Sequence, residues 1–267
     1  METDPVAENV AQARISRRSL LKLLAEAGAG TAVAGTVPSI GARATGPATP
    51  ASAPAEHEWC MVIDLRRCDG CGKCTEACQQ THYLSEDQEW IKVYKMPGAD
   101  GQTYYMPRLC MQCARPPCVR VCPVAATYQN AEGVVLVDQN KCIGCRTCMA
   151  ACPYEARYFN WNDPPPAPAL LQQAMPEFPV PQQRGTVGKC ILCVHNTDVG
   201  KLPACVAACS MEALYIGDFK SDVMTNGHDT RVLSQYLRDN DVVRYKDELG
   251  TEPRVYYVLG HGQDLDY

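Results

Sequence analysis

The stretch from Cys118 to Pro153 reads CVRVCPVAATYQNAEGVVLVDQNKCIGCRTCMAACP, and its cysteines recur at short, regular intervals. From Cys142 to Cys152 they follow the pattern CxxCxxCxxxC. Sixteen of the 17 cysteines in the 267-residue chain fall into four such sets, which share an opening CxxC and a closing CxxxC. The sets are Cys68, Cys71, Cys74 and Cys78; Cys110, Cys113, Cys118 and Cys122; Cys142, Cys145, Cys148 and Cys152; and Cys190, Cys193, Cys205 and Cys209. This repeat indicates that cysteine has one chemical task throughout the chain.

The spacing is suited to iron–sulfur clusters. Three thiolates in a tight CxxCxxC loop bind one 4Fe-4S cube, whereas the fourth cysteine points away and ligates the other cluster of a pair, as in two-cluster ferredoxins. The second set widens its middle gap to four residues and the fourth set to eleven, and neither change removes a ligand. The pattern therefore predicts ferredoxin-type iron–sulfur binding.

Two other uses of cysteine fit this pattern less well. A structural zinc site takes two CxxC pairs on separate loops to build one tetrahedron, and disulfide-dense scaffolds are usually short chains of fewer than about 100 residues. With 46 % hydrophobic residues, this chain can build a core without such staples. Cys60 lies outside every set, in the apolar stretch WCMVIDL, and is predicted to be a small buried hydrophobe.

The N-terminus predicts export. Arg17 and Arg18 precede a mildly apolar stretch, and Ala42-Arg43-Ala44 is a small-residue cleavage site, so residues 1–44 resemble a twin-arginine signal peptide followed by a linker at 45–58. This resemblance implies export of a folded protein that already holds its cofactor. Its thiolates would then be committed to metal before they reach an oxidising compartment.

Two classes of partner are disfavoured by composition. Beyond residue 44 there is no apolar run of about 18 residues, so the mature chain is expected to have no transmembrane span of its own. The formal net charge of −5 does not favour nucleic acid as a partner.

The segments between the cysteine sets predict short strands. They are MVIDL (61–65), ATYQN (126–130), VVLVD (134–138), ARYFNW (156–161) and ALYIGD (213–218), together with a hairpin formed by EWIKVYKM (89–96) and TYYMPRL (103–109). We therefore expect an α+β fold of tandem ferredoxin-like modules, two dicluster domains built from short strands and helices with many loops.

The expected domain boundaries follow from these segments. Residues 59–79 plus 188–218 form the first dicluster module, and residues 80–161 form the second, with a hairpin insertion at 80–109. Residues 162–187 are a proline-rich connector that we expect to lack regular structure. Residues 219–267 form a C-terminal extension, with one helix near 232–237 and one strand, RVYYVL (254–259).

From Trp59 to about Asp218 the sequence resembles the four-cluster iron–sulfur subunits of respiratory membrane complexes, relatives of the beta subunits of dimethyl sulfoxide, polysulfide, tetrathionate and nitrate reductases. The marks are PRLCMQCARPPCVRVCP (107–123) and the widened CILCVHNTDVGKLPACVAAC (190–209). Every ligand position holds cysteine, so the resemblance implies four 4Fe-4S clusters as cofactors. An export signal of its own and no C-terminal anchor make the chain most similar to the periplasmic O subunit of the Dsr membrane complex of sulfur metabolism.

The family resemblance also implies a crossed pairing of ligands. In this pairing the first three cysteines of each set ligate one cluster, and the closing cysteine of another set is the fourth ligand of that cluster. The implied ligand groups are Cys68, Cys71 and Cys74 with Cys209; Cys190, Cys193 and Cys205 with Cys78; Cys110, Cys113 and Cys118 with Cys152; and Cys142, Cys145 and Cys148 with Cys122.

The function implied by the resemblance is electron relay without a substrate site of its own, at the periplasmic face of the cytoplasmic membrane. One end would face a membrane-integral quinone-interacting subunit, and the other end would face a multihaem cytochrome or catalytic subunit. We expect the module of the second and third sets to be the end that faces the membrane-integral subunit. The alternatives are the iron–sulfur subunit of a molybdopterin oxidoreductase such as tetrathionate reductase, or a soluble polyferredoxin. A catalytic cluster with an open iron is disfavoured because four complete sets leave no site open.

Charged residues beside the ligands have two interpretations, tuning of the cluster potential or a solvated basic surface. They are Arg66, Arg67, Lys73, Arg115, Arg120, Lys141, Arg146 and Lys189. The histidines show no metal-like pairing, and His195, within the long loop of the fourth set, is expected to make a structural contact.

Overall fold

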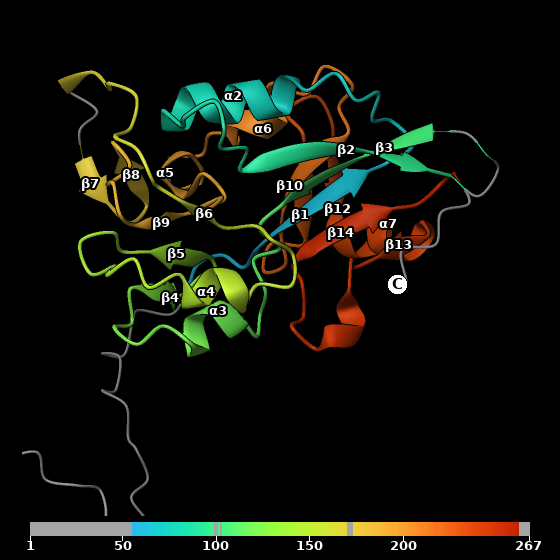
Figure 1. The fold of residues 1–267 in the computed structure, drawn as a ribbon. Helices are drawn as coiled ribbons and strands as arrows, with labels where there is room; N and C mark the ends of the chain where they lie inside the picture. Colours follow the sequence, from blue (N-terminus) through green and yellow to red (C-terminus); the bar gives the residue numbers. More distant parts are fainter. Residues whose placement is uncertain (1–54, 99–100, 102, 170–172, 262–267) are drawn as a thin grey trace, which may run out of the picture. The chain divides into compact units, whose positions relative to one another are not determined.

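The computed structural model describes residues 55–98, 101, 103–169 and 173–261, which all belong to one unit of the chain, Pro50–Tyr267 (Figure 1). The predicted signal peptide at 1–44 and most of the linker at 45–58 lie outside the described residues.

A six-stranded sheet joins segments that are far apart in the sequence. Its order is β12-β11-β10-β1-β14-β13. β1 (Trp59–Asp64) lies antiparallel to β10 (Leu214–Asp218) and parallel to β14 (Val255–Val258), so the predicted strands MVIDL and ALYIGD are neighbours. β11 (Val223–Thr225) and β12 (Thr230–Val232) extend one edge of the sheet, and β13 (Val242–Val243) forms the other.

The two faces of this sheet have different neighbours, because successive side chains of a strand point to opposite sides. Cys60 and Val62 pack with Leu233 of α7 (Leu233–Asp239). Met61 and Ile63 instead belong to the core cluster that contains the cysteine loops. Cys60 is only 1 % exposed, which agrees with its predicted role as a small hydrophobe.

Short helices carry the cysteine loops, and they pack in two pairs. α2 (Lys73–His82) packs against α6 (Ala204–Ala207), and α3 (Pro117–Arg120) packs against α4 (Thr147–Ala150), as Figure 1 shows. The one-turn helix α5 (Val194–Thr197) follows Cys193 directly. This repeated arrangement of short strands, short helices and loops is the predicted α+β class.

Small two-stranded sheets complete the unit. The predicted hairpin is formed by β2 (Ile91–Pro97) and β3 (Thr103–Leu109), and the predicted strands beside the second and third sets are β4 (Thr127–Gln129) and β5 (Val135–Val137). β6 (Tyr158–Phe159) pairs with β9 (Val187–Gly188). None of the helices in the described ranges is long and apolar enough to cross a bilayer.

Two expectations need correction. Residues 162–187 are not devoid of regular structure, because β7 (Gln173–Met175) and β8 (Phe178–Val180) form a hairpin. Prolines are tolerated there since Pro176 lies in the turn and Pro179 in a strand that pairs on one side only. In the C-terminal extension, α7 and β14 confirm the predicted helix and strand, but the segment also supplies β11, β12, β13 and the 3₁₀ turn η2 (Asp247–Leu249).

Candidate iron–sulfur sites

The four cysteine sets share a local backbone conformation. The residue before the second cysteine of each set has a positive φ in all four cases, 80° at Gly70, 45° at Gln112, 68° at Gly144 and 55° at Leu192. At Gly70 glycine is also required by space, because a Cβ would lie 2.4 Å from the ring of Tyr105. The left-handed residue reverses the chain tightly between the two cysteines of each CxxC.

The third cysteine of each set has the same place in a helix. Cys74, Cys118, Cys148 and Cys205 are each the second residue of α2, α3, α4 and α6. The fourth cysteine follows one helical turn later, and its sulfur can accept a backbone hydrogen bond. Thr127 N donates to Cys122 Sγ at 3.4 Å, and Ala213 N donates to Cys209 Sγ at 3.3 Å.

Three hollows are each lined by four cysteines, and each combines three from one set with the closing cysteine of another. Site A is lined by Cys68, Cys71, Cys74 and Cys209; site C by Cys110, Cys113, Cys118 and Cys152; and site D by Cys122, Cys142, Cys145 and Cys148. Their empty volumes are similar, about 320, 310 and 290 Å³. These combinations are the ones that the crossed pairing predicts.

The remaining four cysteines of the sets, Cys78, Cys190, Cys193 and Cys205, gather deeper in the protein. Burial raises the pKa of Cys78 well above its usual value, and the neighbouring thiols of Cys190, Cys205 and Cys193 raise it further. All four are buried. We call this group site B.

Proximity between thiols also gives the order of the sites. Besides burial, Cys74 of site A raises the pKa of Cys205 in site B. In the same way Cys110 of site C raises the pKa of Cys190 in site B, and Cys118 of site C raises that of Cys148 in site D. The sites therefore follow one another in the order A, B, C, D.

The cysteine groups suit a cluster better than a single ion. Among the described residues, no three or more His, Cys, Asp or Glu side chains are arranged to hold one metal ion. The sulfurs of a site instead surround a hollow, and the rest of its lining is mostly apolar, as with Val93, Pro107 and Leu214 in site A. A shell of cysteine sulfurs around a hollow with a mostly apolar lining fits a 4Fe-4S cube, which thiolates ligate.

Two buried cations lie beside the cysteines of sites B, C and D. Lys189 is 1 % exposed and its Nζ donates to the carbonyl oxygen of Cys190 at 2.6 Å. Arg157 is 5 % exposed, and although burial lowers its pKa, the thiols of Cys118, Cys148 and Cys110 raise it above the usual value. Within the described ranges neither side chain forms an ion pair with a carboxylate. Thiolates ligating clusters would supply the missing negative charge.

The other basic residues singled out in the sequence have surface positions or partners. Lys73 donates to Ser210 Oγ, Arg146 lies over the rings of Phe159 and Trp161, and Arg120 is exposed. The ion pairs are Arg66 with Asp64, Arg67 with Glu212, Arg115 with Glu252, and Lys141 with Asp138. Among these eight basic residues, Lys189 is thus the one whose environment supports tuning of the potential of a cluster.

Sequence analysis missed Arg157 and also the position of His82. Burial lowers the pKa of His82 to about 3, and its Nε2 lies 3.3 Å from Cys193 Sγ. The available signal was spacing, since His82 follows Cys78 by four residues and therefore shares its face of α2.

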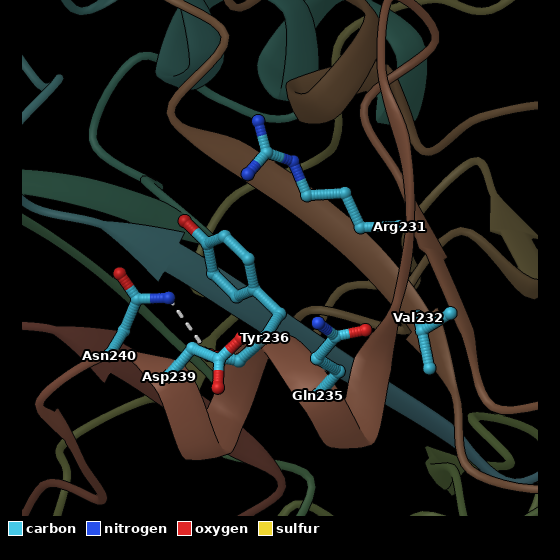
Figure 2. A pocket seen from close by; sticks show the side chains of 6 residues that line it. All are labelled: Arg231, Val232, Gln235, Tyr236, Asp239 and Asn240. Atoms are coloured by element: carbon cyan, nitrogen blue, oxygen red, sulfur yellow. Dashed lines mark hydrogen bonds between the residues drawn. The ribbon is translucent and has the colours of Figure 1, made fainter.

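A separate polar hollow lies against α7, lined by Arg231, Val232, Gln235, Tyr236, Asp239 and Asn240 (Figure 2). Two of its polar side chains are paired, since Arg231 forms an ion pair with Asp229 and Asn240 Nδ2 donates to the carbonyl oxygen of Tyr236. In the described part of the chain, the buried polar side-chain atoms without a partner lie elsewhere. They belong to His82, Gln88, Trp90, Arg108, Arg157 and His195.

Comparison with known proteins identifies the same chemistry. Three overlapping family profiles, each described as a 4Fe-4S dicluster domain, match residues 67–126, 101–165 and 134–210. The Hdr-like menaquinol oxidoreductase iron-sulfur subunit 1 of Archaeoglobus fulgidus is 33 % identical over 93 % of this chain and 100 % of its own length. The selenate reductase of Mesobacillus selenatarsenatis has one subunit that is 38 % identical over 76 % of this chain and 72 % of its own length. The tetrathionate reductase of Salmonella typhimurium has one that is 35 % identical over 76 % of this chain and 72 % of its own length.

Proposed function

Because this chain belongs to the family of ferredoxin-type iron–sulfur subunits of respiratory membrane complexes, we propose that it relays single electrons through four 4Fe-4S clusters between two partner subunits. In this proposal the chain has no substrate site of its own. Its thiolates hold the clusters, and the surrounding core fixes their spacing.

The ligands we propose are the four cysteines of each site. The support for this assignment is that sites A, C and D each form a hollow lined by four cysteines, and that the thiols of site B are close neighbours. When bound, each cluster supplies one-electron redox chemistry, with a potential set by burial, net charge and hydrogen bonds to its sulfurs.

The observation that carries the proposal is that each site has thiols close to those of the next site. Site A connects to site B, B to C and C to D through neighbouring thiols. Cys71 of site A and Cys145 of site D are exposed, whereas all the cysteines of site B are buried. A line that is buried in the middle and open at both ends suits a protein that receives an electron at one end and delivers it at the other.

The surface around site D favours contact with an apolar partner. Ile143 is 64 % exposed and Trp161 is 59 % exposed, and Val124, which lines the site with Ile143, is 36 % exposed. Large exposed apolar side chains that gather in one place are typical of an interaction surface. We therefore propose that this end faces a membrane-integral, quinone-interacting subunit, and that site A faces a multihaem cytochrome or catalytic subunit.

The proposed setting is the periplasmic face of the cytoplasmic membrane, reached by the twin-arginine route, in dissimilatory sulfur metabolism. It is supported by the Arg17-Arg18 pattern, and by relatives named as subunits of a menaquinol oxidoreductase and of tetrathionate reductase. A second candidate is the iron–sulfur subunit of a molybdopterin oxidoreductase, which the tetrathionate and selenate reductase relatives favour.

Purification of the full chain from its native membranes tests the function. A tagged chain solubilised in mild detergent should bring other subunits with it, and the complex should contain at least about sixteen non-haem irons for each copy of this chain and show EPR signals from reduced 4Fe-4S clusters. The expected partners are a membrane-integral subunit together with a cytochrome, or with a molybdopterin subunit in the second candidate. A chain that remains freely soluble and alone would favour a polyferredoxin and contradict the relay between subunits.

A further inference from the structure

One face of α2 carries a stripe of three buried side chains at intervals of four residues, Cys74, Cys78 and His82. Residues four apart in a helix lie one above the other. Cys74 belongs to site A and Cys78 to site B, so the stripe continues past site B to His82. The imidazole reaches a second cysteine of that site, with Nε2 3.3 Å from Cys193 Sγ.

The contact defines which ring nitrogen of His82 carries the proton. Nε2 can donate to Cys193 Sγ in every protonation state of the ring except the one in which Nδ1 alone carries the proton. A proton on Nδ1 would leave a buried donor without a partner, because in the described part of the chain Nδ1 has none. It would also set the lone pair of Nε2 against the lone pairs of a thiolate. With the proton on Nε2, the same contact becomes an N–H···S hydrogen bond, and an orphaned buried donor is avoided.

Aromatic neighbours hold the His82 ring in this orientation. Trp90 lies against it with ring centroids 4.9 Å apart, and His195 meets it edge-on at 5.3 Å. Phe178 packs on His195 at 4.2 Å and closes the cluster. His82 is 1 % exposed, so its hydrogen bond lies in a region of low dielectric, where such bonds are electrostatically stronger than in water.

We propose that His82 is a positioning residue that donates its Nε2–H to the ligand thiolate of Cys193 and thereby raises the reduction potential of the cluster in site B. This inference rests on the proposed ligation of a cluster by Cys78, Cys190, Cys193 and Cys205. The donor stabilises the reduced state more than the oxidised state, because the cluster and its thiolates carry one additional negative charge after an electron is added. The proton stays on Nε2, so the electron is the only particle transferred.

The test compares the full chain with His82→Phe, in the purified complex, by redox titration monitored by EPR. The signal that is lost in Cys193→Ala identifies the cluster of site B. We expect about a tenfold lower ratio of reduced to oxidised cluster at a fixed potential, which corresponds to ~59 mV for one electron.

Two further variants separate the hydrogen bond from packing. His82→Gln keeps an N–H donor at this position and should recover part of the potential. His195→Phe alters the same aromatic cluster but removes no donor to Cys193 that the structure shows, so it should leave the potential close to that of the unmodified chain. Equal potentials for His82→Phe and the unmodified chain would overturn the proposal, as would an equal decrease in His82→Phe and His195→Phe.

Pulsed EPR gives a measurement that does not depend on a variant retaining its cluster. In the unmodified chain labelled with ¹⁵N-histidine, the reduced cluster of site B should couple to a histidine nitrogen and to a proton that exchanges in D₂O. Absence of both couplings would overturn the role of His82. If Cys193→Ala instead removed no cluster, the proposed ligation of site B would fail, and that outcome is distinguishable because the iron content would be unchanged.

Discussion

Cysteine replacement provides a quantitative test of the crossed pairing. Cys209 belongs to the fourth set in the sequence, yet it lines site A with Cys68, Cys71 and Cys74. If these four hold one cluster, Cys71→Ala and Cys209→Ala each remove the same group of four irons. Each variant should then fall from about sixteen to about twelve irons per chain.

Double replacements distinguish crossed from local ligation. Crossed pairing predicts that Cys71→Ala with Cys209→Ala still retains about twelve irons, because both residues serve site A. Cys71→Ala with Cys78→Ala should retain only about eight, because Cys78 serves site B. Ligation within each sequence set predicts the reverse order, since Cys71 and Cys78 would then share one cluster.

The assay combines iron and acid-labile sulfide analysis with EPR of the reduced protein, and Cys60→Ala is the matched control. Cys60 is buried in the core on the opposite face of the sheet, so its loss should cost about 1 kcal/mol of stability and no iron. If Cys71→Ala and Cys209→Ala lost different EPR signals, or if Cys71→Ala with Cys209→Ala held only about eight irons, the pairing would be refuted.

Three further perturbations have defined outcomes. Arg157→Gln removes a buried cation between sites C and D, so redox titration should show the potentials of both clusters lowered by roughly 60 mV. Asp218→Asn should lower the free energy of unfolding at pH 7 by about 2 kcal/mol in guanidinium titration. Burial raises the pKa of Asp218, but hydrogen bonds from Glu58 N and His57 outweigh burial and lower this pKa to about 2. The carboxylate therefore stabilises the fold above about pH 4, and this stabilisation is lost as the pH falls toward 2. Removal of the clusters by a chelator should abolish the cooperative unfolding transition seen by circular dichroism, because Lys189 and Arg157 would be left buried without counter-charges.

The cysteine loops were predictable because their geometry is local. A CxxCxxC loop, the helix that begins beside its third cysteine and the short strand that follows are specified within about twenty residues. The strands β1, β4, β5 and β10 and the hairpin of β2 and β3 all lie where the sequence predicts them. The matches to 4Fe-4S dicluster domains confirm the family and the cofactor class.

The arrangement of the C-terminal extension was not predictable from pattern. β11, β12 and β13 have two or three residues each, too few for an alternation of apolar and polar side chains to be recognised. β14 lies parallel to β1, and a parallel pair requires a long connection whose partner strand no local signal identifies. The sheet that supports the cysteine loops is therefore built largely from the segment that the sequence left least defined.

The buried charges beside the sites were also beyond sequence analysis, with one exception. Arg157 follows Cys152 by five residues, but only the fold brings it to Cys118 and Cys148. His82 is the exception, because the four-residue interval from Cys78 is visible in the sequence. Its contact with Cys193 depends on the packing of α2 against α6 and the adjoining loop, and that is a tertiary property.

The distribution of cations has a consequence for electron flow. Each oxidised cluster with its four thiolates carries a net charge of about −2, and each electron adds one more negative charge. Surface residues such as Arg115 are paired with carboxylates and contribute little net charge. Lys189 is buried beside site B and Arg157 between sites C and D, so they favour the reduced state of clusters held there. Cys71 of site A and Cys145 of site D are exposed, so solvent also has that role at these two ends, and a docked partner would displace it. We therefore expect the chain's own buried cations to raise the potentials of the clusters in sites B, C and D, and a docked partner to change those of the clusters at the exposed ends.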